Sequence, residues 1–315
     1  MNKIDIILPT YNGEKYIKEL LDSIINQTYT EFIIIVRDDG SKDNTVKIFM
    51  DYKRRYPTKF EVIEDNLGNL GVINNVFEIL KYSKSKYIMF CDQDDIWFEN
   101  KILQLLQCIK QKEKANYGVP IIVHSEVVVV DEELEVLDES YSHYGGLNRK
   151  RIHLCNLIQK NEVQGSSLIC NKYLLDLSRK LIEKRNYKLV YHDYWFAVLA
   201  SVFGRIYFYS TPLMHYRQHS NNLVGARRSR ISLKSCFKLT ISEKNRLRYN
   251  NYLITNKEIC NVLLKLYKSD LTDEQIKIIY HFKDRPSDLI EFFKLKLYRY
   301  YNLKELIVIL LFGIH

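Results

Sequence analysis

The amino-acid sequence predicts an α/β protein in which a mixed, mostly parallel sheet is flanked by helices, with a helical extension at the C-terminal end. Two observations indicate this fold. Over residues 4–91, apolar strand-like runs alternate with segments whose apolar residues recur at helical spacing, the order that builds a parallel sheet with helices on both faces. Beyond residue 225 the pattern is helical, which indicates a second unit.

The elements of the first half follow from this patterning and from the residues that interrupt it. Strands are predicted at residues 4–8, 32–36, 60–64 and 87–91. Helices are predicted at residues 17–25, 45–56 and 72–82, the first of them with an apolar stripe on one side. Turn residues stop the elements, as Asn12-Gly13 does after the first strand and Pro57 after the second helix. Strands joined through helices in this way are expected to pair in parallel.

The second half predicts a mixed sheet and then helices. Strands are predicted at residues 121–123, 127–130, 168–170 and 213–215, and helices at 172–184 and 191–200. The acidic segment 131–139 and the glycine-containing segment 141–151 are predicted as loops. The last helices are predicted at 227–266 and 288–312. We therefore expect two domains, residues 1–225 and 226–315.

Three carboxylates follow the strand at 87–91 within four positions, in Asp92-Gln93-Asp94-Asp95. Such close like charges repel unless a cation or ligand donors compensate them. The oxygen ligands of this cluster suit Mg²⁺ or Mn²⁺, held together with the phosphates of a substrate. The cluster therefore predicts a metal and a diphosphate. The alternative is an acidic turn that caps a helix beginning near Ile96.

Polar residues also follow the first two strands directly, in Thr10-Tyr11-Asn12 and in Asp38-Asp39-Gly40. In open parallel sheets, ligands bind outside the carboxyl ends of the strands. We therefore expect these two loops and the loop at Asp92 to meet in one site.

Four motifs in order resemble those of family 2 glycosyltransferases with the GT-A fold. They are Pro9-Thr10-Tyr11-Asn12-Gly13, Asp38-Asp39-Gly40-Ser41-Lys42-Asp43, Asn66-Leu67-Gly68-Asn69-Leu70-Gly71 and Asp92-Gln93-Asp94-Asp95. With downstream motifs the resemblance covers about residues 3–225. Residues 92–97, 192–195 and 216–225 also look like bacterial rhamnosyltransferases of polysaccharide biosynthesis.

The resemblance implies a set of nucleotide-sugar binding residues. They are Pro9, Thr10, Tyr11, Asn12, Asp38, Asp39, Asn66, Gly71, Asp92, Gln93 and Arg217. Thr10 and Tyr11 offer a hydroxyl and an aromatic face for a pyrimidine, while Asp38 and Asp39 accept from the base and the ribose. A solvated Asp-Gly turn and a glycine-rich turn that needs no ligand are the alternatives at 38–40 and 66–71.

The resemblance also implies the metal ligands and the base. Asp94 is expected to coordinate Mg²⁺ or Mn²⁺, with Asp92 shared between metal and ribose, whereas Asp95 is expected to cap the following helix. His219 is expected to bind the metal or a phosphate, with a structural role as the alternative. Asp193 matches the family's catalytic base, although this chain has His192 where relatives commonly carry Glu. An ordinary helix N-cap is the alternative for Asp193.

Four further residues are predicted to contact the acceptor or the sugar: Trp97, Gly165, His192 and Trp195. Both tryptophans follow acidic motifs, and an indole can stack on a sugar ring. Core packing is the alternative for at least one of them.

Charge is concentrated near the C-terminal end. The last 95 residues hold 18 Lys and Arg against 9 Asp and Glu, an excess that equals the whole net charge of +9. Cations are interleaved with aromatic residues at 292–301, which is typical of helices that lie on anionic membranes. A homodimer or domain contact is the alternative. No run of eighteen apolar residues occurs, so we expect a cytoplasmic protein, peripheral at the inner face of the membrane.

These features favour a metal-dependent inverting glycosyltransferase. The resemblance implies transfer of L-rhamnose from dTDP-β-L-rhamnose to a glycan or polyprenyl-diphosphate-linked acceptor in cell-surface polysaccharide synthesis. A UDP-hexose-dependent galactosyl- or glucosyltransferase of the same fold is the alternative. A nucleotidyltransferase would require a glycine-rich loop with a Lys near the N-terminus, which residues 10–14 lack. A nucleic-acid binding protein would use the basic segment, with salt-sensitive affinity; we expect no nucleic-acid partner.

Overall fold

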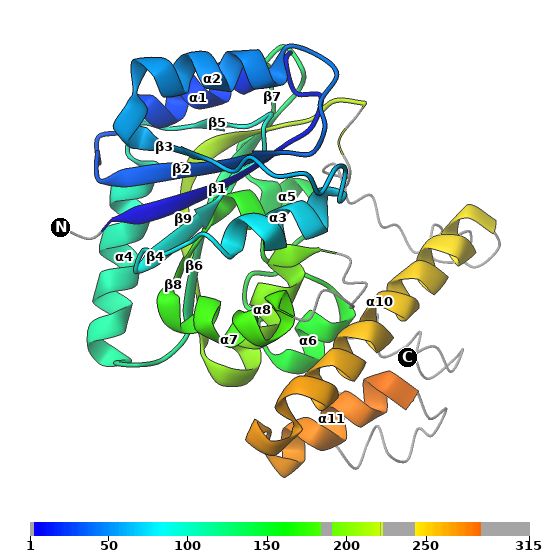
Figure 1. Ribbon diagram of the computed structural model, residues 1–315. Coiled ribbons are helices and arrows are strands. Elements are labelled where there is room, and N and C mark those ends of the chain that lie inside the picture. The colour runs from blue at the N-terminus through cyan, green and yellow to red at the C-terminus, as the bar shows by residue number, and fades with distance from the viewer. Residues whose placement is uncertain (1–2, 184–190, 221, 223–242, 285–315) are drawn as a thin grey trace. The chain divides into compact units, whose positions relative to one another are not determined.

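The computed structural model describes residues 3–183, 191–220, 222 and 243–284 (Figure 1). The described residues belong to two compact units. Residues 3–149, 163–183, 191–220 and 222 form the first, and residues 150–162 and 243–284 form the second. The boundary predicted near residue 225 lies outside the described residues. The sequence did not indicate that residues 150–162 belong with the later helices.

The first unit is built around one sheet. Its strands are β1 (Ile4–Thr10), β2 (Phe32–Asp38), β3 (Phe60–Val62), β4 (Tyr87–Phe90), β5 (Ile96–Trp97), β6 (Ile121–Val130), β7 (Val136–Asp138), β8 (Leu168–Asn171) and β9 (Arg205–Arg217). The described strands are ordered β3-β2-β1-β4-β8-β6-β9-β5, with β7 beside β6. The pairs among β1 to β4 are parallel, whereas β8 is antiparallel to both β4 and β6. The mixed, mostly parallel sheet is confirmed.

Helices cover both faces of this sheet (Figure 1). They are α1 (Ile17–Ile25), α2 (Thr45–Arg55), α3 (Val72–Leu80), α4 (Lys101–Ala115), α7 (Lys172–Ile182) and α8 (His192–Phe203), with the short α5 (Tyr141–Tyr144) in a loop. One continuous core joins the inward faces of α1, α2 and α4 to alternate residues of the central strands, such as Ile4, Ile6 and Leu8 of β1. The residues between these point to the other face of the sheet. Because helices cover that face too, the central strands have no polar face.

The register places the three polar loops together. Thr10 at the end of β1 is paired with Asp38 at the end of β2. On the other side of β1, Ile7 is paired with Phe90 at the end of β4. Because parallel strands end at the same edge, the residues that follow β1, β2 and β4 emerge beside one another.

Several predicted elements differ from those observed. Residues 121–130 form the single strand β6, in which every residue is buried, so the polar His124-Ser125-Glu126 that suggested a break lies inside the sheet. The segments predicted as loops contain β7 and α5. The helix predicted near Ile96 begins at Lys101, because Ile96 and Trp97 pair with His215 and Met214 of β9 instead.

The second unit is helical in its described part. It contains α6 (Leu154–Gln159), α10 (Glu243–Tyr267) and α11 (Asp273–Asp284), and α10 packs against α11. Ile259, Leu263 and Ile279 are buried within this unit. The helix α11 was not predicted. The predicted helix 288–312 and the start of the predicted helix 227–266 lie outside the described residues. None of the described helices is long and apolar enough to cross a membrane.

Candidate functional site

The loops that follow β1 and β2 are joined by their polar residues. The Thr10 hydroxyl donates to Asp38 at 2.8 Å, and the Asn12 backbone N–H donates to the Ser41 hydroxyl at 2.8 Å. Asp38 also accepts the backbone N–H groups of Gly40 and Ser41. These bonds form at the end of the sheet, where Pro9 is paired with Arg37. The structure therefore brings Pro9, Thr10, Asn12 and Asp38 together as the sequence predicted.

Gln93 joins the loop after β1 to the loop after β4. Its side-chain oxygen accepts from the Tyr11 N–H at 3.0 Å, and its NH₂ donates to the Tyr11 carbonyl at 3.0 Å. A Cβ at Gly13 would lie 2.4 Å from this oxygen, so any side chain at position 13 would displace Gln93. The Tyr11 ring is 47% exposed and remains available to stack on a planar ligand.

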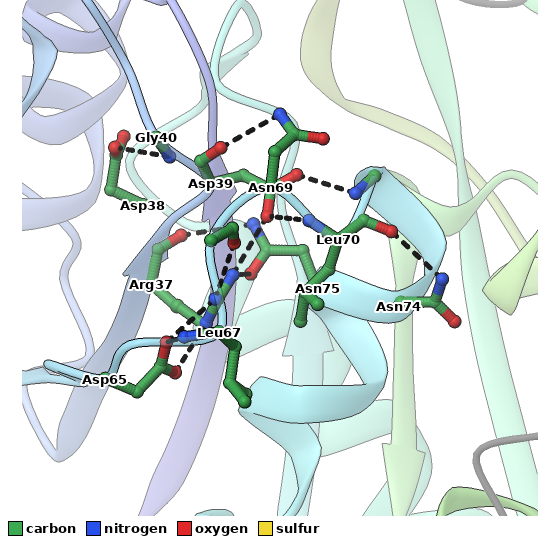
Figure 2. A network of polar contacts seen from close by, with 12 residues as sticks. Arg37, Asp38, Asp39, Gly40, Asp65, Leu67, Asn69, Leu70, Asn74 and Asn75 are labelled. Atoms are coloured by element: carbon green, nitrogen blue, oxygen red, sulfur yellow. Dashed lines mark hydrogen bonds and ion pairs between the residues drawn. The ribbon is translucent and has the colours of Figure 1, made fainter.

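A buried cluster around Arg37 holds the segment of residues 65–71, which we call the 65–71 loop (Figure 2). Arg37 donates to Asp65 at 2.7 and 2.9 Å and to Asp39 at 2.9 Å. Asp39, only 3% exposed, also accepts the backbone N–H groups of Leu70 and Gly71. The Asp39 carboxylate, predicted to contact the nucleotide, is thus bonded within the protein.

The two other predicted residues of this loop lie at its surface. Asn66 is exposed, and Gly71 adopts a positive φ of 75° where it precedes α3. That backbone conformation favours glycine, and a Cβ there would meet nothing within 4 Å. The turn therefore favours glycine at position 71, and nucleotide contact by Asn66 and Gly71 stays a prediction.

Asp94 and His219 come together from distant parts of the chain. The His219 Nε2 lies 2.8 Å from an Asp94 oxygen, and the Asn222 amide lies 3.3 Å from the same oxygen. The imidazole stacks on the Tyr16 ring, with centroids 4.8 Å apart. Among the described residues, no group of three or more His, Cys, Asp or Glu is arranged to hold a metal ion. The protein offers two converging ligands here, an imidazole and a carboxylate.

Asp92 is close enough to both Asp94 and Asp193 for their charges to act on it. Burial, together with the charges of Asp94 and Asp193, raises the pKa of the Asp92 carboxyl to about 7. This mutual effect means that the three carboxylates share one electrostatic environment. A divalent cation would favour the ionised form of Asp92 and relieve the repulsion.

Asp193 lies in the first turn of α8. The N-cap of this helix is Tyr191, so the N-cap alternative for Asp193 is wrong. One Asp193 oxygen accepts the Tyr194 backbone N–H at 2.7 Å. A Cβ at Gly165 would lie 3.1 Å from both the Asp193 Cβ and the His192 Nε2, so Gly165 packs closely on both residues.

His192 contacts Phe90, and the two tryptophans are buried in the core. The His192 ring lies 4.9 Å from the Phe90 ring, and burial lowers the pKa of its imidazole to about 4, which keeps it neutral at pH 7. Trp97 is 2% exposed and Trp195 is fully buried. Neither indole presents a face to a sugar, so the prediction of sugar stacking is corrected for both. Each packs in the core because its element is buried.

Arg217, predicted to bind the nucleotide sugar, is 3% exposed at the end of β9. Its guanidinium bonds to Glu19 and to the Glu132 carbonyl and lies over the Tyr16 ring, 4.6 Å from the centroid. Since His219 stacks on the same Tyr16 ring, Arg217 supports the residue that contacts Asp94. Phosphate contact by Arg217 stays a prediction.

A buried pair behind the carboxylates was missed by sequence reasoning. Asp95 is 1% exposed, and neither of its carboxylate oxygens has a hydrogen-bond partner among the described residues. It therefore caps no helix, which corrects the prediction. Lys101, fully buried, donates to the Ser166 carbonyl at 2.6 Å. A Lys at the start of an amphipathic helix suggests an exposed side chain, so no signal in the sequence indicated this burial.

Comparisons with known proteins agree on one family. The family model described as Glycosyl transferase family 2 matches residues 5–174. The dTDP-rhamnosyl transferase RfbG of Shigella flexneri is 29% identical over 244 residues, which cover 73% of this chain and 77% of RfbG. The UDP-Glc:α-D-GlcNAc-diphosphoundecaprenol β-1,3-glucosyltransferase WfgD of Escherichia coli is 29% identical over 136 residues, or 40% of this chain and 49% of WfgD.

Solved structures agree on the fold. The crystal structure of Staphylococcus aureus TarS residues 1–349 in complex with UDP-GlcNAc has a TM-score of 0.58 at 20% identity. The match covers 96% of this chain and 77% of the TarS chain. The mixed sheet flanked by helices thus corresponds to that of GT-A glycosyltransferases.

Proposed function

Because the chain belongs to glycosyl transferase family 2, we propose that it transfers L-rhamnose from dTDP-β-L-rhamnose to a hydroxyl group of a lipid-linked glycan, with inversion at the anomeric carbon. The observation that carries the proposal is the convergence of the Asp94–His219 pair, Asp92 and Asp193 at one edge of the sheet. The similarity to the dTDP-rhamnosyl transferase RfbG supports the choice of donor.

The residues at this edge fit a divalent cation. Mg²⁺ and Mn²⁺ are usually bound by one or two carboxylates together with substrate phosphates, so three protein ligands are not required. Asp94 and His219 would hold the ion, with Asp92 as a further ligand. An imidazole ligand favours Mn²⁺ over Mg²⁺, which takes oxygen ligands. When bound, the cation would stabilise the charge that develops on the departing diphosphate.

The chain's own residues supply the remaining steps. Tyr11 offers an exposed ring to the thymine base, and the Thr10–Asp38 pair lies at the adjoining strand ends. The Asp193 carboxylate accepts the proton of the acceptor hydroxyl as that oxygen bonds to the anomeric carbon and the bond to the diphosphate breaks. Displacement from the opposite face converts the β-rhamnosyl donor into an α-rhamnoside.

The acceptor and the place of reaction follow from relatives and from charge. The name of WfgD specifies a diphosphoundecaprenol acceptor, which supports a polyprenyl-diphosphate-linked glycan here. The basic residues near the C-terminal end would bring the enzyme to an anionic membrane, although 285–315 lie outside the described residues. Sedimentation with anionic liposomes should decrease when residues 288–315 are deleted; unchanged sedimentation would favour a dimer contact.

A panel of nucleotide sugars tests the donor. The purified protein is incubated with Mn²⁺, a lipid-linked acceptor extract and each donor in turn, and the released nucleoside diphosphate is measured. We expect release from dTDP-β-L-rhamnose and an α-linked product by NMR. Release from UDP-glucose or UDP-galactose instead would establish the alternative, a UDP-hexose-dependent enzyme. No release from any donor would contradict the proposed function.

A further inference from the structure

We propose that Arg37 is a positioning residue for donor binding, which fixes the 65–71 loop against the end of β2 so that the nucleoside side of the site is formed before the donor arrives. The inference rests on the proposed function, because it assigns the donor nucleoside to this side of the site. Arg37 is not among the residues predicted to bind the nucleotide sugar, and it directly precedes the Asp38-Asp39 motif.

The Arg37 guanidinium connects three segments of the chain. It is buried at 2% exposure and donates to Asp39 beside it on β2, to Asp65 and the Gly68 carbonyl of the loop, and to Asn75 of α3. Asn75 in turn donates to the Arg37 carbonyl. Figure 2 shows the guanidinium between Asp65 and Asn75. A planar group with five N–H donors suits this arrangement, which the single point charge of a Lys does not reproduce.

Asp39 holds the other end of the same loop. Its carboxylate accepts from Leu70 at 2.7 Å and from Gly71 at 2.8 Å, while the Asn69 amide donates to the Asp39 carbonyl at 2.9 Å (Figure 2). Arg37 therefore binds the start of the loop through Asp65 and its end through Asp39. Because both Asp39 carboxylate oxygens accept from protein donors, Asp39 contributes to donor binding through the loop that it holds.

The loop needs such an anchor. It contains Gly68 and Gly71, both with positive φ, and glycine loses more conformational freedom on ordering than any other residue. A Cβ at either position would meet nothing within 4 Å, so packing does not hold these glycines in place. The ion pairs of Arg37 order the loop during folding. The loop therefore loses less conformational entropy when a ligand binds.

The anchored loop adjoins the predicted nucleoside residues. Asp39 follows Asp38 directly, and Asp38 accepts the Thr10 hydroxyl. The side chains that the loop leaves at the surface are Asn66, Asn69 and Leu67, the last 39% exposed. Two amides and an aliphatic side chain on a fixed backbone are suited to a base and a ribose.

Arg37→Lys tests the proposal, with Arg54→Lys as the matched control. Arg54 is exposed on α2 and pairs with Asp51 there. Binding of dTDP and UDP in the presence of Mn²⁺ is measured by calorimetry, the donor KM and kcat by product release, and the exchange of the Leu70 and Gly71 amide protons by NMR. We expect Arg37→Lys to weaken nucleotide binding and raise the donor KM by about 10- to 100-fold, with kcat at saturating donor retained.

The amide exchange should be faster in Arg37→Lys and slow again when dTDP is bound, whereas Arg54→Lys should match the unmodified protein throughout. Unchanged exchange, or faster exchange with unchanged nucleotide binding, would overturn the proposal. If Arg37→Lys does not fold, Asp65→Asn replaces it with the same expected results, because it removes the charge that the guanidinium binds at the start of the loop. Failure of the unmodified protein to bind either nucleotide would contradict the proposed function instead, while the exchange still reports on the anchor.

Discussion

Two basic side chains, Arg37 and Lys101, are buried, and they differ in whether carboxylates pair with them. Arg37 donates to Asp39, Asp65, Asn75 and the Gly68 carbonyl. Lys101 donates to the Ser166 carbonyl and contacts the Met214 sulfur at 3.2 Å, and among the described residues no carboxylate forms an ion pair with it. The nearby Asp95 carboxylate has neither oxygen hydrogen-bonded in the described part of the chain.

The ionisation of the two clusters follows from this difference. Hydrogen bonds to Asp65 raise the pKa of the Arg37 guanidinium, so Arg37 stays charged. Desolvation lowers the pKa of Lys101 to about 7, although Asp95, Cys91 and Asp92 oppose this shift. Burial, with the charges of Asp94 and Asp92, raises the pKa of Asp95 well above its ordinary value. The Arg37 carboxylate partners are paired within the protein, whereas Asp92 and Asp95 lie where we propose that a cation binds.

The largest effect is expected at the proposed metal ligand Asp94. Asp94→Ala removes a carboxylate that contacts His219 and one of the charges that raise the Asp92 pKa. Transfer should fall by about 1,000-fold or more, because electrostatic stabilisation of the leaving group is lost. Product release is measured over a range of Mn²⁺ concentrations. Thermal unfolding should be unchanged or improved, since a like charge has been removed.

Asp51→Ala is the control for Asp94→Ala, because Asp51 is a carboxylate on α2 that pairs with Arg54 outside the site. This variant should keep its activity. Substantial transfer by Asp94→Ala with the metal chelated would exclude the metal role.

The proposed base, Asp193, should show a separate effect on turnover. Asp193→Asn keeps the shape of the side chain but cannot accept the acceptor proton, so kcat should fall by about 100- to 10,000-fold. Donor binding should be retained, because Asp193 lies beside Gly165 and His192 rather than at the Arg37 side. Single-turnover kinetics and calorimetry distinguish the two effects. Turnover within about tenfold of the unmodified protein would require another base.

Replacing each buried cation by Met compares the clusters directly. Arg37→Met leaves Asp39 and Asp65 without their counter-charge and should cost about 3–5 kcal/mol of the free energy of unfolding. Lys101→Met removes a charge that burial already disfavours and should cost less than half as much, because a well-packed apolar side chain can replace a poorly paired buried charge. Urea unfolding at pH 7 gives both values. Equal costs would mean that the two clusters do not differ as described.

The smallest effect is a pH dependence of metal binding. The pKa of Asp92 is raised to about 7 in the folded protein, above the unfolded value of about 3.9. Its contribution to stability is therefore fully present below about pH 4 and lost as the pH rises through 7. A cation binds the ionised form, so the thermal stabilisation by Mn²⁺ with dTDP should be larger at pH 8 than at pH 6.

The same measurement on Asp94→Ala serves as the control for this pH dependence, and the difference between the two pH values should shrink there. Stabilisation that is equal at pH 6 and pH 8 in the unmodified protein would contradict a cation site at Asp92.

Much of the fold could be predicted because its signals are local. The alternation of apolar strands and amphipathic helices before residue 91 produced the parallel part of the sheet, with β1, β2 and β4 close to their expected bounds. The prediction of a helix beginning near Ile96 was wrong because of a distant contact. Two residues paired with the distant strand β9, and no periodicity in a short segment reports such a partner.

The sequence by itself determined the α/β fold and the position of the Thr10, Asp38 and Asp92 loops at strand ends, because apolar periodicity fixes strands and parallel strands end at one edge. Only the tertiary structure decided what these side chains face. It brought His219 to Asp94 across 125 positions, turned Asp39 toward Arg37, and buried Asp95 with Lys101. Burial and partners depend on register and on packing between distant segments, and these set the charge that each carboxylate carries.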